Sequence, residues 1–189
     1  MIRWGITANS HDAAVAVFDG KEIKFAAHAE RSSGKKNDKF LNSTIISQAL
    51  EYGEPDEVHW YETQWLKRLR QIKSGQYQLA FNKESPRTTL ANLGVKTRPY
   101  FCDESFMFPK STPAFVNHRH HASHAAAGYF TSPYQDAAVL VIDSIGEFET
   151  LTMWKGQGRD LKQVYSQGYP HSIGLWYSAM TQRIGLKPN

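Results

Sequence analysis

Three side chains of this sequence have the types and the spacing of a metal site. His120 and His124 are four residues apart, so on a helix they share one face and can bind one cation. Asp143 ends an apolar run, where a carboxylate is costly unless it is paired or bound to metal. Two imidazoles and one carboxylate suit Fe(II), Zn(II) or Mn(II). The alternatives are a solvated histidine cluster at a helix start and an ordinary aspartate that begins a turn.

The neighbouring residues narrow the chemistry of such a site. Position 121 is a histidine, whereas the metalloprotease pattern H-E-x-x-H has its general base there. His118 and His121 lack the spacing of His120 and His124, so they are expected to be supports of the two ligand histidines or bystanders. The single cysteine, Cys102, excludes both an internal disulfide and a thiolate metal cluster, so a metal site here must use His, Asp and Glu.

Two turns of small polar residues, 7–12 and 143–147, are predicted in equivalent places, each after the first strand of a group. Exposed backbone N–H groups in such turns can hold phosphate. His11, in the first turn, is a candidate general base for a hydroxyl group. The Lys35-Lys36 pair, in the following basic loop, is a candidate phosphate contact. The alternatives are a surface histidine and a solvated loop.

The elements that must position these residues follow from hydrophobic periodicity and turn signals. Asp19-Gly20 predicts a hairpin, and the run 137–143 is apolar throughout, which predicts a strand buried on both faces. Polar residues predict a loop over 30–38 and an irregular excursion over 82–113. The predicted strands are 3–7, 13–18, 21–28, 57–61, 114–117, 137–143, 149–154 and 160–167, and the predicted helices are 41–52, 62–79, 118–130 and 172–184.

The order of these elements repeats along the chain. Three strands followed by a helix open each half, which suits the ribonuclease-H-like unit that actin-like ATPases carry in two copies. We therefore expect an α/β protein of the actin-like fold. Residues 1–133 would form a complete first lobe, and residues 134–189 would form a second lobe cut off after its first helix.

The composition is that of a globular protein. The chain has 189 residues, 41% of them hydrophobic and 21% charged, and no apolar run approaches the roughly 20 residues of a membrane span. Its start lacks the pattern of a signal peptide, so a cytoplasmic location is expected. The net charge of +4 is small. Nucleic-acid binding through the basic residues between 67 and 83 is therefore the less favoured interpretation, and would require a steep salt dependence.

A spaced set of short motifs runs along the whole chain. These are Gly5-Ile6 with Ser10-His11-Asp12-Ala13-Ala14, Ala29-Glu30-Arg31 with Lys35-Lys36, His120-His121-Ala122-Ser123-His124-Ala125-Ala126, Ala138 to Asp143 with Gly146-Glu147, and Ser172-Ile173-Gly174 leading to Tyr177 and Gly185-Leu186-Lys187-Pro188-Asn189. The set resembles the O-carbamoyltransferases of nodulation-factor and antibiotic tailoring.

The resemblance implies a two-lobed, actin-like transferase domain related to the proteins that transfer threonylcarbamoyl to tRNA. A separate domain would make carbamoyl adenylate from carbamoyl phosphate and ATP, and the actin-like domain would pass the carbamoyl group to a hydroxyl of a small-molecule acceptor. The missing C-terminal lobe and the adenylate-forming domain would be supplied in cis or in trans. Threonylcarbamoyl transfer to tRNA, and a non-catalytic remnant or split-enzyme subunit, are the alternative functions.

The resemblance also implies roles for individual residues. His120, His124 and Asp143 would bind Fe(II), His11 would deprotonate the acceptor, and Lys36 would line the acceptor site. The residues along the carbamoyl adenylate would be Ser144, Ile145, Ser172, Gly174 and Tyr177. The sequence departs from the family pattern at Ser144, where glycine is common, and at Asn37, where a histidine is usual.

Overall fold

The computed structural model describes residues 1–80 and 113–187 of the chain, and it confirms the predicted α/β class. The predicted excursion over 82–113 lies, apart from its last residue, outside the described residues. The chain groups into two compact units, one from residues 1–65 and 76–118 and the other from 66–75 and 119–189. The two predicted lobes, 1–133 and 134–189, remain a prediction about the complete fold.

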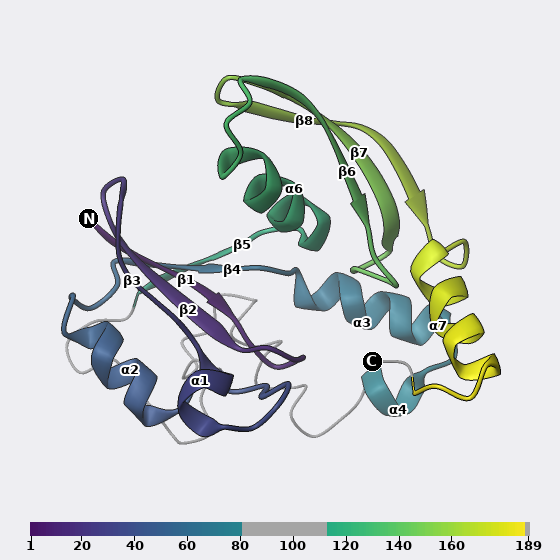
Figure 1. The fold of residues 1–189 in the computed structure, drawn as a ribbon, viewed down its shortest axis with the longest axis horizontal. Helices are drawn as coiled ribbons and strands as arrows, with labels where there is room; N and C mark the ends of the chain where they lie inside the picture. Colours follow the sequence, from purple (N-terminus) through teal and green to yellow (C-terminus); the bar gives the residue numbers. More distant parts are fainter. Residues whose placement is uncertain (81–112, 188–189) are drawn as a thin grey trace. The chain divides into compact units, whose positions relative to one another are not determined.

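The first unit is built on a five-stranded mixed sheet (Figure 1). Its strands lie in the order β3-β2-β1-β4-β5; β1 pairs antiparallel with β2 and parallel with β4, and β4 pairs parallel with β5. Gly20, with a φ of 60°, makes the predicted hairpin between β2 and β3. The strands are β1 (Ile2–Thr7), β2 (Ala14–Asp19), β3 (Glu22–His28), β4 (Glu57–Trp60) and β5 (Ala114–Asn117).

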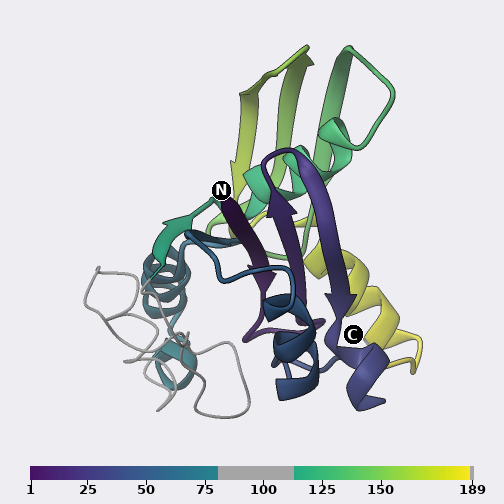
Figure 2. The same cartoon turned by 90° about the vertical axis from the view of Figure 1, so that its left-hand side faces the viewer.

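Two helices of the first unit, α1 (Ala29–Ser33) and α2 (Ser43–Leu50), lie beside β2 and β3 (Figure 2). The Asn42 side chain caps α2 by accepting a hydrogen bond from the Ile45 backbone N–H at 3.0 Å. The core between sheet and helices is apolar and fully buried, with Trp4, Ile6, Val15, Val17, Ile45, Ile46 and Ala49 among its members. This core fixes the first strands, and with them the turn that carries His11.

Two local predictions around these helices were wrong. The segment 30–38 is not a loop throughout, because α1 occupies its first residues and ends at Gly34, which has a left-handed φ of 64°. The predicted helix over 62–79 is two helices, α3 (Gln64–Lys73) and α4 (Tyr77–Ala80). Gly75, with a φ of 73°, separates them, because a residue in that conformation cannot continue a right-handed helix.

The second unit is an antiparallel meander with a helix across one face. Its strands β6 (Asp136–Ile142), β7 (Glu149–Gln157) and β8 (Asp160–Gly168) pair in chain order. Helix α6 (His120–Phe130) lies against β6 and β7 (Figures 1 and 2), where Ala125 packs with Val141 and Trp154. Helix α7 (Ile173–Arg183) follows β8 and begins at the capping hydroxyl of Ser172.

Strand β6 is not buried on both faces as predicted. Its side chains alternate: Val139 and Val141 face the core under α6, whereas 56% of Leu140 and 48% of Ile142 are exposed. Within the described residues, β7 is the strand that pairs with β6. The apolar run thus reflects one buried face, with exposed apolar residues on the other.

Gly156, in β7, leaves room for the ring of Tyr129 on α6. A Cβ at position 156 would lie 2.4 Å from that ring, and the Tyr129 hydroxyl is anchored by hydrogen bonds to the carbonyls of Gln135 (2.6 Å) and Gly158 (3.2 Å). We expect Gly156→Ala to destabilise the protein by about 1–3 kcal/mol, because the ring cannot move aside without losing these bonds. Gly128→Ala is the control, since its Cβ would meet nothing within 4 Å. Chemical denaturation measures both; equal stability of the two variants would contradict this packing.

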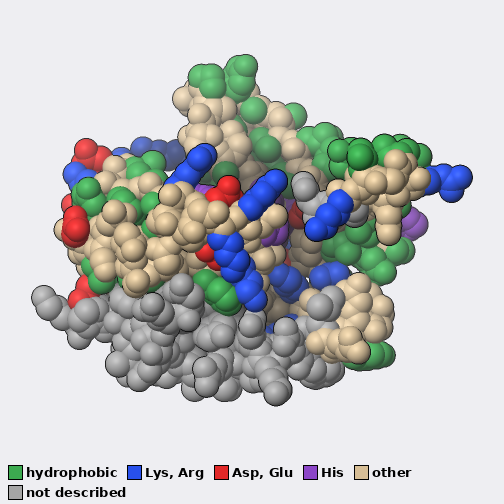
Figure 3. Space-filling model, turned by 60° about the horizontal axis from the view of Figure 1, so that its bottom comes forward, with side chains coloured by type: hydrophobic (Ala, Val, Ile, Leu, Met, Phe, Trp, Pro, Cys, Tyr) green, Lys and Arg blue, Asp and Glu red, His purple; other side chains and the backbone are tan. Residues whose placement is uncertain are grey.

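The surface of the described residues has two features that bear on partners. No described helix has the length and apolarity required to cross a lipid bilayer. Figure 3 shows Lys and Arg side chains on the face that it draws, with acidic and neutral side chains among them.

Candidate functional site

Three candidate metal ligands come together in the second unit. His120 and His124 project from the first two turns of α6, and Asp143 follows the last residue of β6. The Nε2 atoms of the two histidines lie 3.0 Å apart, and Nε2 of His120 lies 2.9 Å from Oδ2 of Asp143. The three donor atoms lie within 4.8 Å of one another, a separation that one cation can bridge. The predicted i,i+4 pair and the strand-end carboxylate therefore converge.

The surroundings of Asp143 keep its carboxyl group ionised. The hydrogen bond from His120 lowers the pKa of Asp143 to about 2, against the opposing effect of burial, and the Ser144 backbone N–H adds a hydrogen bond of 2.6 Å to Oδ1. Because the pKa is depressed, the stability that this ion pair contributes is present above the ordinary value of 3.8 and is lost as the pH falls through about 2. Near neutral pH, protonation of Asp143 would therefore not release a bound cation.

His121 supports the site from inside the unit. It is fully buried, and its Nδ1 lies 2.9 Å from the Thr152 hydroxyl, which also accepts a hydrogen bond of 2.8 Å from the indole of Trp154. The Thr152 hydroxyl can donate to Nδ1 or accept from it, and burial lowers the pKa of His121, which favours the neutral ring. The contact joins α6, which carries the two candidate ligand histidines, to β7.

The turn after Asp143 packs directly on α6. A Cβ at Gly146 would lie 2.8 Å from the His121 ring and 3.2 Å from the His120 ring, so only glycine fits between turn and helix without displacement. The Glu147 carboxylate that follows is buried, with the Arg119 guanidinium 3.9 Å away. Contacts between α6 and the turn after Asp143 therefore hold His120 and Asp143 close together.

The start of α7 approaches the same turn. The Ser172 hydroxyl lies 3.2 Å from the Asp143 carbonyl oxygen and 2.6 Å from that of Ser144, and it also caps α7 by accepting from the Leu175 N–H at 3.0 Å. Gly174 is so close that a Cβ there would lie 2.6 Å from the Ser144 nitrogen. The structure therefore brings Ser144, Ser172 and Gly174 together beside the metal candidates.

Gly174→Ala should weaken the candidate metal site without removing a candidate ligand. Its Cβ would also lie 2.7 Å from the Asp143 carbonyl oxygen, and because these are backbone atoms, either α7 or the turn must shift. We expect cation affinity to fall about 10-fold or more, the size of effect seen when the surroundings of metal ligands are disturbed. Competition with a chelator measures it. Ser178→Ala, later in α7, is the control; the same affinity in both variants would contradict the argument.

The other two residues predicted along the adenylate show no such convergence. Ile145 is half-buried in the turn. Tyr177 lies farther along α7 with 69% of its surface exposed. Their predicted role remains a prediction.

The first turn, in the other unit, holds His11 beside a carboxylate. His11 Nδ1 lies 2.7 Å from Oδ2 of Asp12, and Nε2 of His28 lies 3.8 Å from the other oxygen. Asn9 and Asp12 have left-handed φ angles of 69° and 54°, a conformation that these residue types tolerate. His11 is 71% exposed. A carboxylate that accepts the Nδ1–H leaves Nε2 of the neutral ring as the base, which is the orientation general-base catalysis needs.

Asn9 and Lys36 of the first unit bear on the predicted binding of polar ligands. Both amide atoms of the Asn9 side chain are buried and, among the described residues, have no hydrogen-bond partner. Such an arrangement is costly in a folded protein, and it suits a turn that binds a polar ligand. Lys36 is exposed in the turn that follows α1, and its predicted contact with the acceptor remains a prediction.

Sequence reasoning missed His28 and Thr152 as parts of the two sites. Counting outward from the hairpin would have placed His28 opposite the residues that follow Asp12, although a bulge shifts the register so that His28 pairs with Ala14. Thr152 had no comparable signal. A hollow on β7 and β8 was also not predicted, and its lining residues include Arg119, Phe148, Glu149, Gln163, Tyr165 and Ser166. None of the predicted site residues lines it.

Comparison with known proteins reaches nearly the whole chain. Residues 2–189 match the sequence model of the carbamoyltransferase N-terminus. The uncharacterized protein sll1178 of Synechocystis sp. is 32% identical over 98% of this chain and 32% of its own length. The uncharacterized protein MJ1051 of Methanocaldococcus jannaschii is 21% identical over 95% of this chain and 29% of its own length. The chain therefore spans about a third of the length of these curated relatives.

Proposed function

This chain belongs to the family of the carbamoyltransferase N-terminus, and on that premise we propose that it carries the metal-binding part of an enzyme that transfers a carbamoyl group from carbamoyl adenylate to a hydroxyl of a small molecule. The family confirms the resemblance noted in the sequence. The observation that carries the proposal is the convergence of His120, His124 and Asp143 in the second unit.

The donor set fits a divalent transition metal. Two imidazole nitrogens and one carboxylate oxygen suit Fe(II), and also Zn(II) or Mn(II), and the low pKa of Asp143 keeps a negative charge ready for the cation. A cation there would polarise an oxygen of the carbamoyl adenylate and stabilise negative charge as it develops. The neutral, buried His121 and the glycines at 146 and 174 hold the ligands in place before any cation arrives.

The remaining candidate residues would orient the two substrates. Ser144, Ile145, Ser172, Gly174 and Tyr177 would lie along the adenylate. In the first unit, Lys36 would contact the acceptor, and His11 would take the proton of its hydroxyl at Nε2 while Asp12 accepts from Nδ1. The acceptor oxygen then bonds to the carbamoyl carbon, the bond from that carbon to the phosphate oxygen breaks, and AMP leaves.

We propose an actin-like, two-lobed fold for the domain to which this chain belongs. An antiparallel group of three strands occurs in both units, as β1-β2-β3 and as β6-β7-β8, and each has a candidate site in the turn after its first strand. Residues 134–189 would begin the second lobe. The rest of that lobe and an adenylate-forming domain would lie in the remaining two thirds of proteins as long as the relatives.

The test uses the complete protein, purified without oxygen and supplied with carbamoyl phosphate, ATP and a panel of hydroxylated acceptors. Pyrophosphate release measures adenylate formation, and mass spectrometry of the acceptor measures transfer. We expect one transition-metal ion per chain and a carbamoylated product. His124→Ala should lose metal and product together. Product formation at the normal rate by metal-free His124→Ala protein would refute the proposed role of the site.

A further inference from the structure

A second pair of histidines lies outside the candidate site, at the ends of two neighbouring strands of the first unit. His59 is on β4, and His118 directly follows β5. The two strands are parallel, with His59 opposite Val116, and the His118 backbone N–H donates to the Trp60 carbonyl at 2.9 Å. The pairing therefore continues past the end of β5 and fixes the backbone of His118 beside that of His59.

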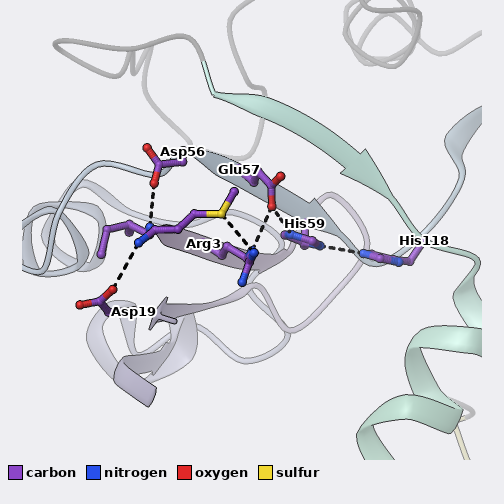
Figure 4. A network of polar contacts seen from close by, with 8 residues as sticks. Arg3, Asp19, Asp56, Glu57, His59 and His118 are labelled. Carbon is purple, nitrogen blue, oxygen red and sulfur yellow. Dashed lines mark hydrogen bonds and ion pairs between the residues drawn. The ribbon is translucent and has the colours of Figure 1, made fainter. Parts of the chain in front are cut away.

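The two rings face each other through their nitrogens (Figure 4). Nδ1 of His59 lies 2.9 Å from Nε2 of His118, and the ring planes differ by 11°. In the candidate metal site, the corresponding nitrogens of His120 and His124 are 3.0 Å apart. Two nitrogens that are each about 2.0–2.1 Å from one metal ion, with an angle of about 90° between the bonds, are about 2.9 Å apart.

A chain of contacts fixes which nitrogen of His59 is available. Nε2 of His59 lies 3.3 Å from Oε2 of Glu57, and the same oxygen accepts a hydrogen bond of 3.0 Å from Arg3 (Figure 4). The Arg3 hydrogen bond, followed by that of His59, lowers the pKa of Glu57, so this carboxylate is ionised and can only accept. Nε2 of His59 is therefore the nitrogen that donates to this carboxylate, and Nδ1, which faces His118, is the nitrogen left to bind a cation.

From this geometry we propose that His59 and His118 form a second metal site, a two-histidine clamp for Cu(II), Ni(II) or Zn(II), with Glu57 as the carboxylate that orients His59. A carboxylate that accepts the other ring N–H is the usual companion of a metal-bound histidine. Imidazole suits these three ions, and Cu(II) is held most tightly among them. The site shares no ligand with the candidate centre, and the proposal does not depend on carbamoyl transfer.

The exposure of the pair suits a site of this kind. The side chain of His59 is 30% exposed and His118 is exposed, so water can complete the coordination of a clamped ion. Two protein ligands give a weaker site than three. We therefore expect it to fill after the candidate centre in any titration, and to exchange its ion more readily.

The experiment is a Cu(II) titration of the complete protein in a background in which His120→Ala and His124→Ala remove the first site. Electron paramagnetic resonance should show Cu(II) coupled to two imidazole nitrogens. His59→Gln and His118→Gln should each abolish that signal, and Glu57→Gln should lower the affinity about 10–100-fold. His171→Gln, which alters an exposed histidine of the other unit, is the control and should change nothing.

His118 lies two residues before His120, so the His59 variant is the decisive one. Should the doubly substituted background fail to fold, the titration is run with the candidate centre intact. The unsubstituted protein should then bind one more equivalent of Cu(II) than His59→Gln. A stoichiometry and a spectrum that His59→Gln leaves unchanged would overturn the proposal, and the pair would be a hydrogen bond that joins two strands.

Discussion

Asp143→Asn in the complete protein should empty the candidate metal centre and abolish carbamoyl transfer. Asparagine keeps the shape of the side chain but removes the negative charge. Because the pKa of Asp143 is lowered to about 2, this charge is present at neutral pH. His120 at the same time loses its 2.9 Å ion-pair partner. We expect the affinity for the cation to fall by at least ~100-fold, more than the 10–100-fold typical of residues that only support ligands.

Asp136→Asn is the matched control, because Asp136 is an exposed residue at the other end of the same strand. Elemental analysis of protein purified without oxygen measures the metal, and transfer is measured on the same preparation. Adenylate formation should persist, since it belongs to another domain in the proposed enzyme. An Asp143→Asn protein that retains a full equivalent of metal would exclude this carboxylate as a ligand.

His11→Asn should abolish transfer while leaving both metal content and adenylate formation intact. The proposed base accepts the acceptor proton at Nε2, and asparagine has no group that can do so at that position. Positioned general bases contribute about 10²–10⁴-fold to rate, which sets the expected loss. Pyrophosphate release and transfer, measured side by side, separate the two half-reactions. Transfer at the normal rate would sink the assignment of His11.

Asp12→Asn should have a smaller effect in the same assay. The amide oxygen can still accept the Nδ1–H of His11, across a contact that is 2.7 Å in the present structure, but a neutral amide is a weaker acceptor than a carboxylate. We expect a transfer rate between those of the unsubstituted protein and His11→Asn. His171→Asn is the control for a general effect of removing an exposed histidine.

The convergence of the metal candidates was predictable because it depends on short-range rules. The i,i+4 spacing of His120 and His124 requires only a helix, and Asp143 requires only the strand that ends before it. The contact between α6 and β6 then follows from the apolar residues that each presents, such as Ala125 and Val141. The hairpin at Gly20 and strand β5 were predictable for the same reason, since turn chemistry and local pattern decide them.

Features that depend on long-range packing were not predictable. The contact of His121 with Thr152 joins residues 31 positions apart, and neither residue type indicates the other. Glycine is needed at 146 because the turn lies against the rings of His120 and His121, and at 174 because α7 lies against the backbone of that turn. Sequence patterns do not encode such close contacts. The prediction that β6 is buried on both faces was wrong, because an apolar sequence does not show whether another element covers its side chains.

The exposed apolar face of β6 affects the solubility of this chain when it is purified by itself. Leu140 and Ile142 lie on an exposed sheet surface. Trp176 of α7 and Ile184, which directly follows that helix, are 64% and 69% exposed. Among the described residues, the outer edge of β6 pairs with no strand, and its backbone groups are a template for another chain. Uncovered apolar surface beside a free strand edge promotes aggregation, so the solubility of the isolated polypeptide should fall steeply as its concentration rises.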